Sequence, residues 1–293
     1  MHKIKHMLCF GLGYTAQCFA HKLHDIGWTV SGSTRDPEKA ANLRRDGVKT
    51  ILWDGREPIT PETLANASAM LLSAAPGADG CPVLNALPEK LNSFAPDMGW
   101  IGYLSTNGVF GNHNGALVTE DSELCGTSDR ARRRIASEQA WLAFGKKTGI
   151  KTVIFRLPGI YGPGRSALDK VRGGTARRLY KAGQAFSRMH VEDIAETLMA
   201  SLNIDHAHRI FNLCDDETAP PQDVIAYACD LLSVEPPPLV PIEEADISPM
   251  ARSFYADNKR ISNARMKDTF KRDLLFPTYR DGLNAILKTE NDT

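Results

Sequence analysis

The sequence predicts an α/β fold, a Rossmann-type doubly wound parallel sheet with a smaller C-terminal substrate lobe. Short apolar runs alternate with helical patterns through the first two-thirds of the chain, an order typical of strand–helix–strand units. A glycine-rich turn, "GLGYTA", directly follows the first apolar run and opens the first helical segment. After residue 157 the sequence becomes rich in glycine, arginine and aromatic residues, which indicates a change of architecture.

The expected strands are short runs of apolar and β-branched residues. In chain order they are "HMLCF" (6–10), "TVSGST" (29–34), "KTILWD" (49–54), "AMLLSAA" (69–75), "WIGYLST" (100–106), "KTVIFRL" (151–157) and "IFNLCD" (210–215). Helical patterns separate them at 14–26, 36–45, 81–94 and 127–148. Because each helix lies between consecutive strands, the strands are expected to pair in parallel, with helices on both faces of the sheet.

Two domains follow from this order. The dinucleotide-binding domain covers 1–157 and is completed by 189–215, whereas 158–188 and 216–293 form the smaller substrate-binding lobe. That lobe includes a proline-rich stretch at 233–249 and a final helix around "YRDGLNAILK". Ligands of such sheets bind at the carboxyl ends of the strands, so the lobe is expected to close over the site.

Composition excludes several functional classes. The 293 residues carry 35 Lys+Arg and 35 Asp+Glu, which argues against a surface devoted to nucleic acid. The six cysteines show no metal-ligand spacing, so we expect no metal site and a reducing, cytoplasmic compartment. We expect no signal peptide and no membrane association, because no apolar run has spanning length. A homodimer is left open.

The turn after the first strand has the pattern G-x-G-x-x-A, formed by Gly11, Gly13 and Ala16. Glycine lets the backbone turn sharply and approach a pyrophosphate, whose charge is then stabilised by the N–H groups at the start of the helix, including those of Tyr14 and Thr15. A glycine-rich turn without a ligand is the alternative, but the strand before it and the helix after it favour dinucleotide binding.

The end of the second strand distinguishes NADP from NAD. Arg35, with Ser33 and Thr34, lies where an NADP enzyme carries a basic group for the 2′-phosphate, so the sequence favours NADP. The alternative is NAD, with Asp36 binding the ribose and Arg35 in solvent. Other expected cofactor residues are Asp54, which ends the third strand near the adenine, and Ala74 and Ala75, which leave room for the cofactor beside the fourth strand.

Four later motifs resemble those of the extended short-chain dehydrogenase/reductase family, the nucleotide-sugar epimerases and dehydratases. They are "YLSTNGVFG", "FRLPGIYGPG", "MHVEDIAE" and "FNLCDDE", in the family's order along the chain. The resemblance places Thr106 at the hydroxyl that hydrogen-bonds the substrate, and Pro158 beside the cofactor. It also implies a Y-x-x-x-K pair on the next helix, where this chain has "RARRR", with Arg130 replacing the tyrosine and Arg134 the lysine.

Arginine cannot act as the acid or base, because its pKa above about 12 keeps it charged. The chain therefore resembles the atypical branch of the family. In this chain, Arg134 can still contact the ribose, and Arg130 can bind an anion. The spacing of residues 130, 134 and 138 puts them on one helical face, directed towards the cofactor. The alternative is that Arg134 and Glu138 simply pair on an exposed helix.

Other residues can replace the missing acid and bind substrate. Tyr161 and His190 can move a proton, although packing for Tyr161 and a helix-start hydrogen bond for His190 are the simpler interpretations. Arg165 and Arg188, in the same segments, can meet a substrate phosphate, with solvated loop arginines as the alternative. His206 and His208, with Asp205, lack a further metal ligand.

These observations predict an NADP-binding oxidoreductase or epimerase of the atypical group. Its expected partner is an anionic small molecule, phosphorylated or nucleotide-linked. A non-catalytic NADP-binding sensor is the second hypothesis. An RNA-binding role for the arginine run is the weakest, because no aromatic residues are interleaved with it.

Overall fold

The computed structural model describes residues 5–45, 47–88 and 91–292. The chain divides into two compact units. The first consists of Met1–Thr106, Ser128–Arg156 and Ala195–Phe211, and the second of Asn107–Thr127, Leu157–Ile194 and Asn212–Thr293. The segment after the fifth expected strand, 107–127, therefore belongs to the second unit, whereas the sequence-based division placed it in the first.

A seven-stranded sheet forms the centre of the fold, in the order β11-β7-β5-β4-β1-β2-β3. Its strands are β1 (His6–Phe10), β2 (Thr29–Thr34), β3 (Lys49–Leu52), β4 (Ala69–Leu72), β5 (Trp100–Thr106), β7 (Lys151–Leu157) and β11 (Ile210–Asn212). The pairs β1–β2, β2–β3, β1–β4 and β4–β5 are parallel. The order reverses direction beside β1, and such a switch point is where ligands bind in doubly wound sheets. The α/β Rossmann-type prediction is confirmed.

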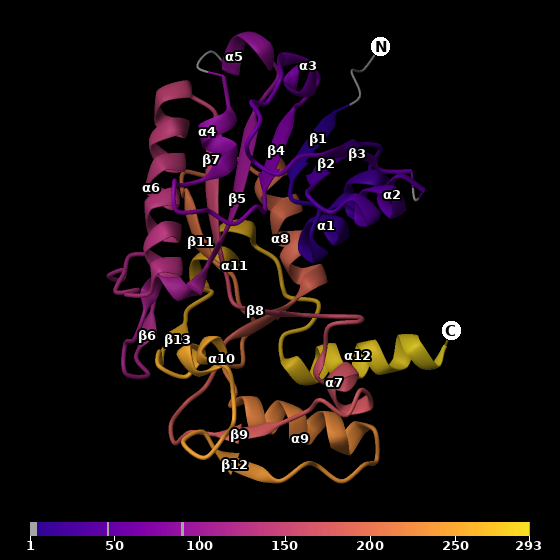
Figure 1. Cartoon of the computed structure of the whole chain (residues 1–293), viewed down its shortest axis with the longest axis vertical. Coiled ribbons are helices and arrows are strands. Elements are labelled where there is room, and N and C mark those ends of the chain that lie inside the picture. Colours follow the sequence, from indigo (N-terminus) through magenta and orange to yellow (C-terminus); the bar gives the residue numbers. More distant parts are fainter. Residues whose placement is uncertain (1–4, 46, 89–90, 293) are drawn as a thin grey trace. The chain divides into compact units, whose positions relative to one another are not determined.

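Helices cover both faces of this sheet (Figure 1). They are α1 (Tyr14–Asp25), α2 (Pro37–Arg45), α3 (Pro61–Leu64), α4 (Pro82–Ala86), α5 (Leu91–Phe94), α6 (Asp129–Thr148) and α8 (Val191–Asn203). Strand β5 shows why both faces are apolar: Trp100 packs on Phe19 of α1, whereas Tyr103 belongs to the core cluster that contains Trp141 of α6. A parallel sheet buried in this way needs continuous apolar strands.

One expected helix is interrupted. The pattern at 81–94 predicts a single helix, but the structure has α4 and α5 instead. Leu87 is extended, with φ −70° and ψ 141°, because the proline ring of Pro88 disfavours helical geometry in the preceding residue. Residues 89–90 of the expected helix lie outside the described residues.

The second unit contains short strands and helices. The strands are β6 (Leu117–Val118), β8 (Gly159–Tyr161), β9 (Arg178–Tyr180), β10 (Arg188–His190), β12 (Leu239–Pro241) and β13 (Arg260–Ile261). The helices are η1 (Asn107–Phe110), α7 (Ala167–Arg172), α9 (Pro221–Leu231), α10 (Pro249–Phe254), α11 (Ala264–Phe270) and α12 (Tyr279–Asn291). Its core packs Tyr161, Leu168 and Ala228 against Tyr279 and Leu283 of α12.

The loop that follows β5 is held by a segment from near the C-terminus. Strand β6 pairs in parallel with β13, with Leu117 opposite Arg260. The backbone carbonyl of Asn258 accepts hydrogen bonds from the N–H groups of His113 and Gly115, both at 3.0 Å. Lys259 donates its Nζ to the carbonyl of Gly111 at 2.9 Å. Residues 111–118 thus owe their conformation to residues 258–261.

Candidate functional site

The turn between β1 and α1 is closed by contacts from two other strands. Gly11 has φ +94°, in the left-handed region that favours glycine, and a Cβ there would lie 3.1 Å from the backbone nitrogen of Ala74. The N–H of Gly11 donates to Ser33 Oγ at 3.2 Å, and that of Leu12 donates to the Ser33 carbonyl at 2.9 Å. Ser33 therefore shapes the turn from β2.

The start of α1 is suited to an anion. Gly13 is the N-cap residue and has no side chain to cap the helix, and the first turn carries no acidic residue. A Cβ on Gly13 would have only Ser73 Oγ, at 3.9 Å, within 4 Å, so the space in front of it is open on the protein side. Thr15 and Ala16 are buried against the sheet. These features fit a pyrophosphate beside the helix N-terminus.

The turn after β2 contains an arginine, Arg35, and an aspartate, Asp36, that have different roles. Asp36 Oδ1 accepts hydrogen bonds from the N–H groups of Glu38 at 3.0 Å and Lys39 at 3.1 Å, so it caps α2. Thr34 Oγ1 accepts from the N–H of Asp36 at 3.2 Å. Arg35 is exposed and makes no side-chain hydrogen bond or ion pair with another described residue.

The remaining predicted cofactor residues of this unit lie at the same end of the sheet. Asp54 is exposed and accepts from the N–H of Arg56 at 3.0 Å, with Arg56 Nε 3.4 Å from its carboxylate. Ala74 is half-buried and donates its N–H to the Phe10 carbonyl at 3.0 Å, while Ala75 is exposed.

The arginines of α6 do not share one environment. Arg130 is exposed in the first turn of the helix. Arg134 lies over the ring of Tyr103 and donates Nη1 to the Leu104 carbonyl at 2.7 Å and to Tyr103 Oη at 3.3 Å. Arg134 is thus hydrogen-bonded to β5 at Leu104, and Leu104 lies two residues before the half-buried Thr106.

Glu138 belongs to a buried network that the sequence analysis did not identify. Its carboxylate accepts Arg156 Nη2 at 2.8 Å, Arg156 Nε at 3.2 Å and Ser105 Oγ at 2.5 Å. Both charged side chains are only 2% exposed. The suggested surface pair between Arg134 and Glu138 is therefore wrong: Glu138 faces the sheet, and its cation comes from β7. Local spacing could not reveal this contact between distant segments.

In the second unit, Tyr161 is a packing residue. It is 8% exposed, and its hydroxyl donates to the Thr278 carbonyl at 3.4 Å. A Cβ added to Gly282 of α12 would lie 2.2 Å from the Tyr161 hydroxyl. Burial is the main reason that the pKa of Tyr161 is raised above its usual value, with the charge of Asp215 adding to it. The geometry favours the packing interpretation over an acid–base role.

His190 lies beside Tyr161, with their ring centroids 5.2 Å apart. Its Nδ1 accepts a hydrogen bond from the N–H of Glu192 at 3.3 Å, at the start of α8, which is the helix-start contact expected from the sequence. Burial lowers the pKa of His190 to about 4, so the imidazole is neutral at physiological pH. With Nδ1 accepting, the proton resides on Nε2.

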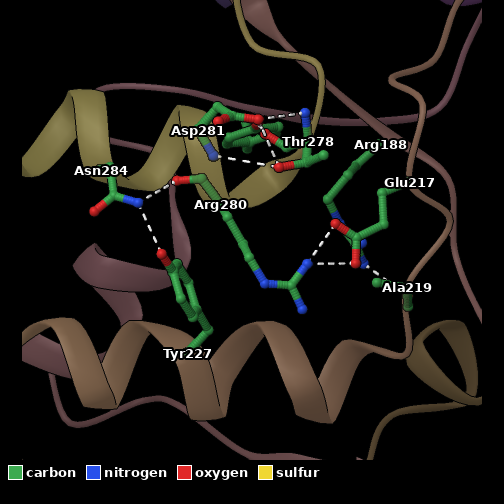
Figure 2. Close-up of polar contacts among 9 residues, drawn as sticks. Arg188, Glu217, Ala219, Tyr227, Thr278, Arg280, Asp281 and Asn284 are labelled. Carbon is green, nitrogen blue, oxygen red and sulfur yellow. Dashed lines mark hydrogen bonds and ion pairs between the residues drawn. The ribbon is translucent and has the colours of Figure 1, made fainter.

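The two predicted substrate arginines differ in burial. Arg165 is exposed, in a turn closed by backbone hydrogen bonds between it and Gly162. Arg188 is half-buried, with Nη2 donating to the Ala219 carbonyl at 3.1 Å and the guanidinium 5.5 Å from the Tyr279 ring centroid. Figure 2 shows it beside Glu217, which pairs with Arg280. Pro158 is half-buried at the start of this unit.

Asp215 is a second residue that the sequence analysis missed. It follows β11, is 4% exposed, and neither of its carboxylate oxygens has a hydrogen-bond partner of good geometry among the described residues. Burial raises the pKa of Asp215 to about 8, although the cation of Arg188 and the N–H of Glu217 oppose the shift. The sequence signal is an acid at the end of the last expected strand (210–215), in "FNLCDDE".

The described part of the chain can also be examined for metal-binding clusters and for helices able to span a membrane. Within residues 5–45, 47–88 and 91–292, no three His, Cys, Asp or Glu side chains come together in an arrangement able to hold a metal ion. His206 instead bonds the His208 carbonyl at 2.8 Å and Ser201 at 3.2 Å. No helix in that part has both the length and the apolar character needed to cross a membrane.

Comparison with known proteins identifies relatives by structure. No family model and no curated protein matches the chain. A solved structure, a functionally unknown conserved protein from Silicibacter pomeroyi DSS, is 43% identical, and the match covers 97% of this chain and 99% of that one with a TM-score of 0.89. The chain belongs to the family of this protein.

Two more distant structures share the fold of this Silicibacter protein family. The dTDP-glucose 4,6-dehydratase of Bacillus anthracis, in complex with NAD, is 15% identical over 99% of this chain and 97% of its own, with a TM-score of 0.77. The UDP-glucuronic acid 4-epimerase of Bacillus cereus, in complex with NAD, is 16% identical over 97% of this chain and 96% of its own, with a TM-score of 0.75. At these identities the likeness establishes the fold alone.

Proposed function

We propose that the chain is an NADP-binding oxidoreductase or epimerase-like protein that acts on a small anionic molecule, phosphorylated or nucleotide-linked. The observation that carries the cofactor assignment is at the tip of β2, where Asp36 caps α2 while Arg35 is exposed. An aspartate used as a helix cap is less suited to a ribose 2′-hydroxyl, and an exposed arginine suits a 2′-phosphate. The NAD complexes of the B. anthracis dehydratase and the B. cereus epimerase support a nicotinamide dinucleotide in this fold.

The residues of the first unit have separate roles in this proposal. Gly13 and the N-terminus of α1 accept the pyrophosphate, Arg35 binds the 2′-phosphate, and Asp54 lies towards the adenine. The bound cofactor would supply the hydride chemistry. Arg130 binds an anionic group of the substrate, and Thr106 hydrogen-bonds a substrate oxygen. We assign to Arg134 the support of β5 rather than a ribose contact, because its guanidinium is bonded to Leu104 and Tyr103.

A non-catalytic NADP sensor is the second candidate, favoured by one specific observation. Positions 130 and 134 hold arginines, and Tyr161, a substitute acid suggested by the sequence, is buried with a raised pKa. Neither arginine can move a proton at physiological pH. All six cysteines, each within the described residues, are free thiols, which supports a reducing cytoplasmic compartment for either candidate.

Isothermal titration calorimetry with NADP and NAD tests the cofactor assignment. Arg35→Ala should weaken NADP at least about tenfold while leaving NAD nearly unchanged, because a charge-assisted hydrogen bond to phosphate contributes about 1.5–3 kcal/mol. Arg133→Ala is the matched control, since Arg133 is also an exposed arginine of the first unit. Equal loss of both cofactors in Arg35→Ala would refute the NADP preference. Full affinity in Gly13→Val would place the cofactor elsewhere.

The choice between enzyme and sensor needs a product measurement. The NADP-loaded protein is incubated with nucleotide sugars and with phosphorylated sugars, and proton NMR follows oxidised, reduced or epimerised products. Turnover of any of these establishes the enzyme. Tight NADP binding with no product from either class favours the sensor.

A further inference from the structure

Eight buried polar atoms of the second unit lack hydrogen-bond partners among the described residues, and four of them lie on three side chains of β10 and the segment after β11. These four atoms are Arg188 Nη1, His190 Nε2, and Oδ1 and Oδ2 of Asp215. His190 is 1% exposed and Asp215 4%. A buried polar atom without a partner is costly, about 1–3 kcal/mol, so such groups call for an additional ligand or water.

The three side chains lie close together. Arg188 and His190 are two residues apart on β10, so both point to the same side of that strand. The N–H of Asp215 donates to the Arg188 carbonyl at 2.8 Å, which places its segment alongside β10. Arg188 also lowers the pKa of Asp215 through its charge, yet no ion pair within 4.0 Å joins the two. A gap therefore separates the guanidinium from the carboxyl.

All three groups are donors near neutral pH. Arg188 is a cation, and His190 carries its proton on Nε2 because Nδ1 accepts from Glu192. Asp215 keeps its proton up to a pKa of about 8, because burial disfavours the carboxylate. The charged or titratable groups that interact with Asp215 are Arg188 from β10, Tyr161 from β8, and Cys214, Asp216 and Glu217 on its own segment.

The nearby carboxylates already have cations of their own. Glu217 pairs with Arg280, and Asp216 with Lys267 at 2.9 Å. Arg188 is thus left as a buried cation without a hydrogen-bonded anion, beside two neutral donors. We propose that Arg188, His190 and Asp215 bind a small oxyanion group, a carboxylate or a phosphate ester. The unpartnered Nη1 of Arg188 is buried, although the residue as a whole is half-buried.

This inference rests on the proposed function for the identity of the ligand, since the anion would be a charged group of the substrate other than the one assigned to Arg130. Binding of a free anion does not require the cofactor. When Asp215 loses its proton it becomes a competing counter-ion of Arg188 and repels the ligand. A monovalent anion should therefore bind about tenfold more weakly at pH 9 than at pH 7, given a pKa of about 8.

The test uses the full chain with acetate as the carboxylate probe and sulfate as the phosphate mimic, because neither changes charge between pH 7 and pH 9. Binding is followed by NMR of histidine-labelled protein at constant ionic strength, with the His190 imidazole as reporter. Arg188→Gln should lose at least about tenfold in affinity. Asp215→Asn keeps a donor at every pH, so it should retain at pH 9 the affinity that the natural protein shows at pH 7. Arg260→Gln, at an exposed arginine of the same unit, is the control.

The proposal is supported by saturable binding of acetate, sulfate or both that Arg188→Gln weakens and that Asp215→Asn makes independent of pH. The probe that binds more tightly then shows whether the natural ligand group is a carboxylate or a phosphate. No saturable shift with either probe means that water alone occupies the gap, and it overturns the proposal. An equal loss of affinity with pH in Asp215→Asn overturns it as well. NADP titration of the same samples is independent, so failure of the cofactor assignment and failure of this site are distinguishable.

Discussion

Replacing Glu138 with glutamine should be among the most destabilising single changes in the first unit. Glu138 and Arg156 are each 2% exposed and form an ion pair in which Nε and Nη2 of Arg156 both donate to the Glu138 carboxylate. Ser105 donates a further hydrogen bond to that carboxylate. Glu138→Gln leaves the Arg156 guanidinium buried without a charged partner. Breaking a buried pair from one side costs about 3–5 kcal/mol, and the remaining amide oxygen places the expected loss near the lower end, about 3 kcal/mol.

The double variant Glu138→Leu with Arg156→Met separates the cost of an orphaned charge from the contribution of the pair itself. Because removing both charges also removes both desolvation penalties, it should recover most of the stability lost by Glu138→Gln. Urea unfolding, followed by tryptophan fluorescence, gives the free energy of unfolding of each variant. A loss below about 1 kcal/mol in Glu138→Gln, or a double variant as unstable as the single one, would refute the reasoning.

Two further predictions concern the second unit. Tyr161→Phe should lower the free energy of unfolding by less than about 1 kcal/mol in urea titration, because it removes one long hydrogen bond and keeps the ring packed; a larger loss would give the hydroxyl a role beyond packing. Asp215 has a folded pKa of about 8, above its unfolded value, so the unfolded state holds fewer protons between these values and stability falls as pH rises. The fall from this group should be about 2 kcal/mol between pH 6 and pH 8 and should disappear in Asp215→Asn, as measured by urea unfolding at each pH.

Much of the fold could be predicted from local sequence. Strands β1, β2, β5 and β7 begin and end at the expected residues. For β1, β5 and β7 the signal is a largely apolar run, which a strand buried on both faces needs. The glycine turn was equally readable, since Gly11 adopts a positive φ. The single helix expected at 81–94 is wrong because Pro88 ends regular helical structure locally, whatever the apolar spacing around it.

The candidate site was predictable only in part. Residues of the glycine turn and the β2 tip are neighbours in sequence as well as in space, so spacing identified them. Glu138 and Asp215 differ, because their environments come from distant segments: Arg156 for the first, and β10 for the second. Burial of a charge is a tertiary property, and no local pattern shows which cation will meet a given acid.

The pairing of β6 with β13 affects the order in which segments of the chain fold during synthesis. Leu117 can pair with Arg260 only after that residue, 143 positions later in the chain, has been synthesised. At a synthesis rate of about 5–20 residues per second, residues 111–118 remain without the backbone partners that define their conformation for about 7–29 s. During that interval residues 117–118 lack their strand partner, and an unpaired segment of this kind can join a neighbouring chain. Folding of the second unit therefore finishes only when translation is almost complete, and a chain truncated before residue 258 would never form this loop.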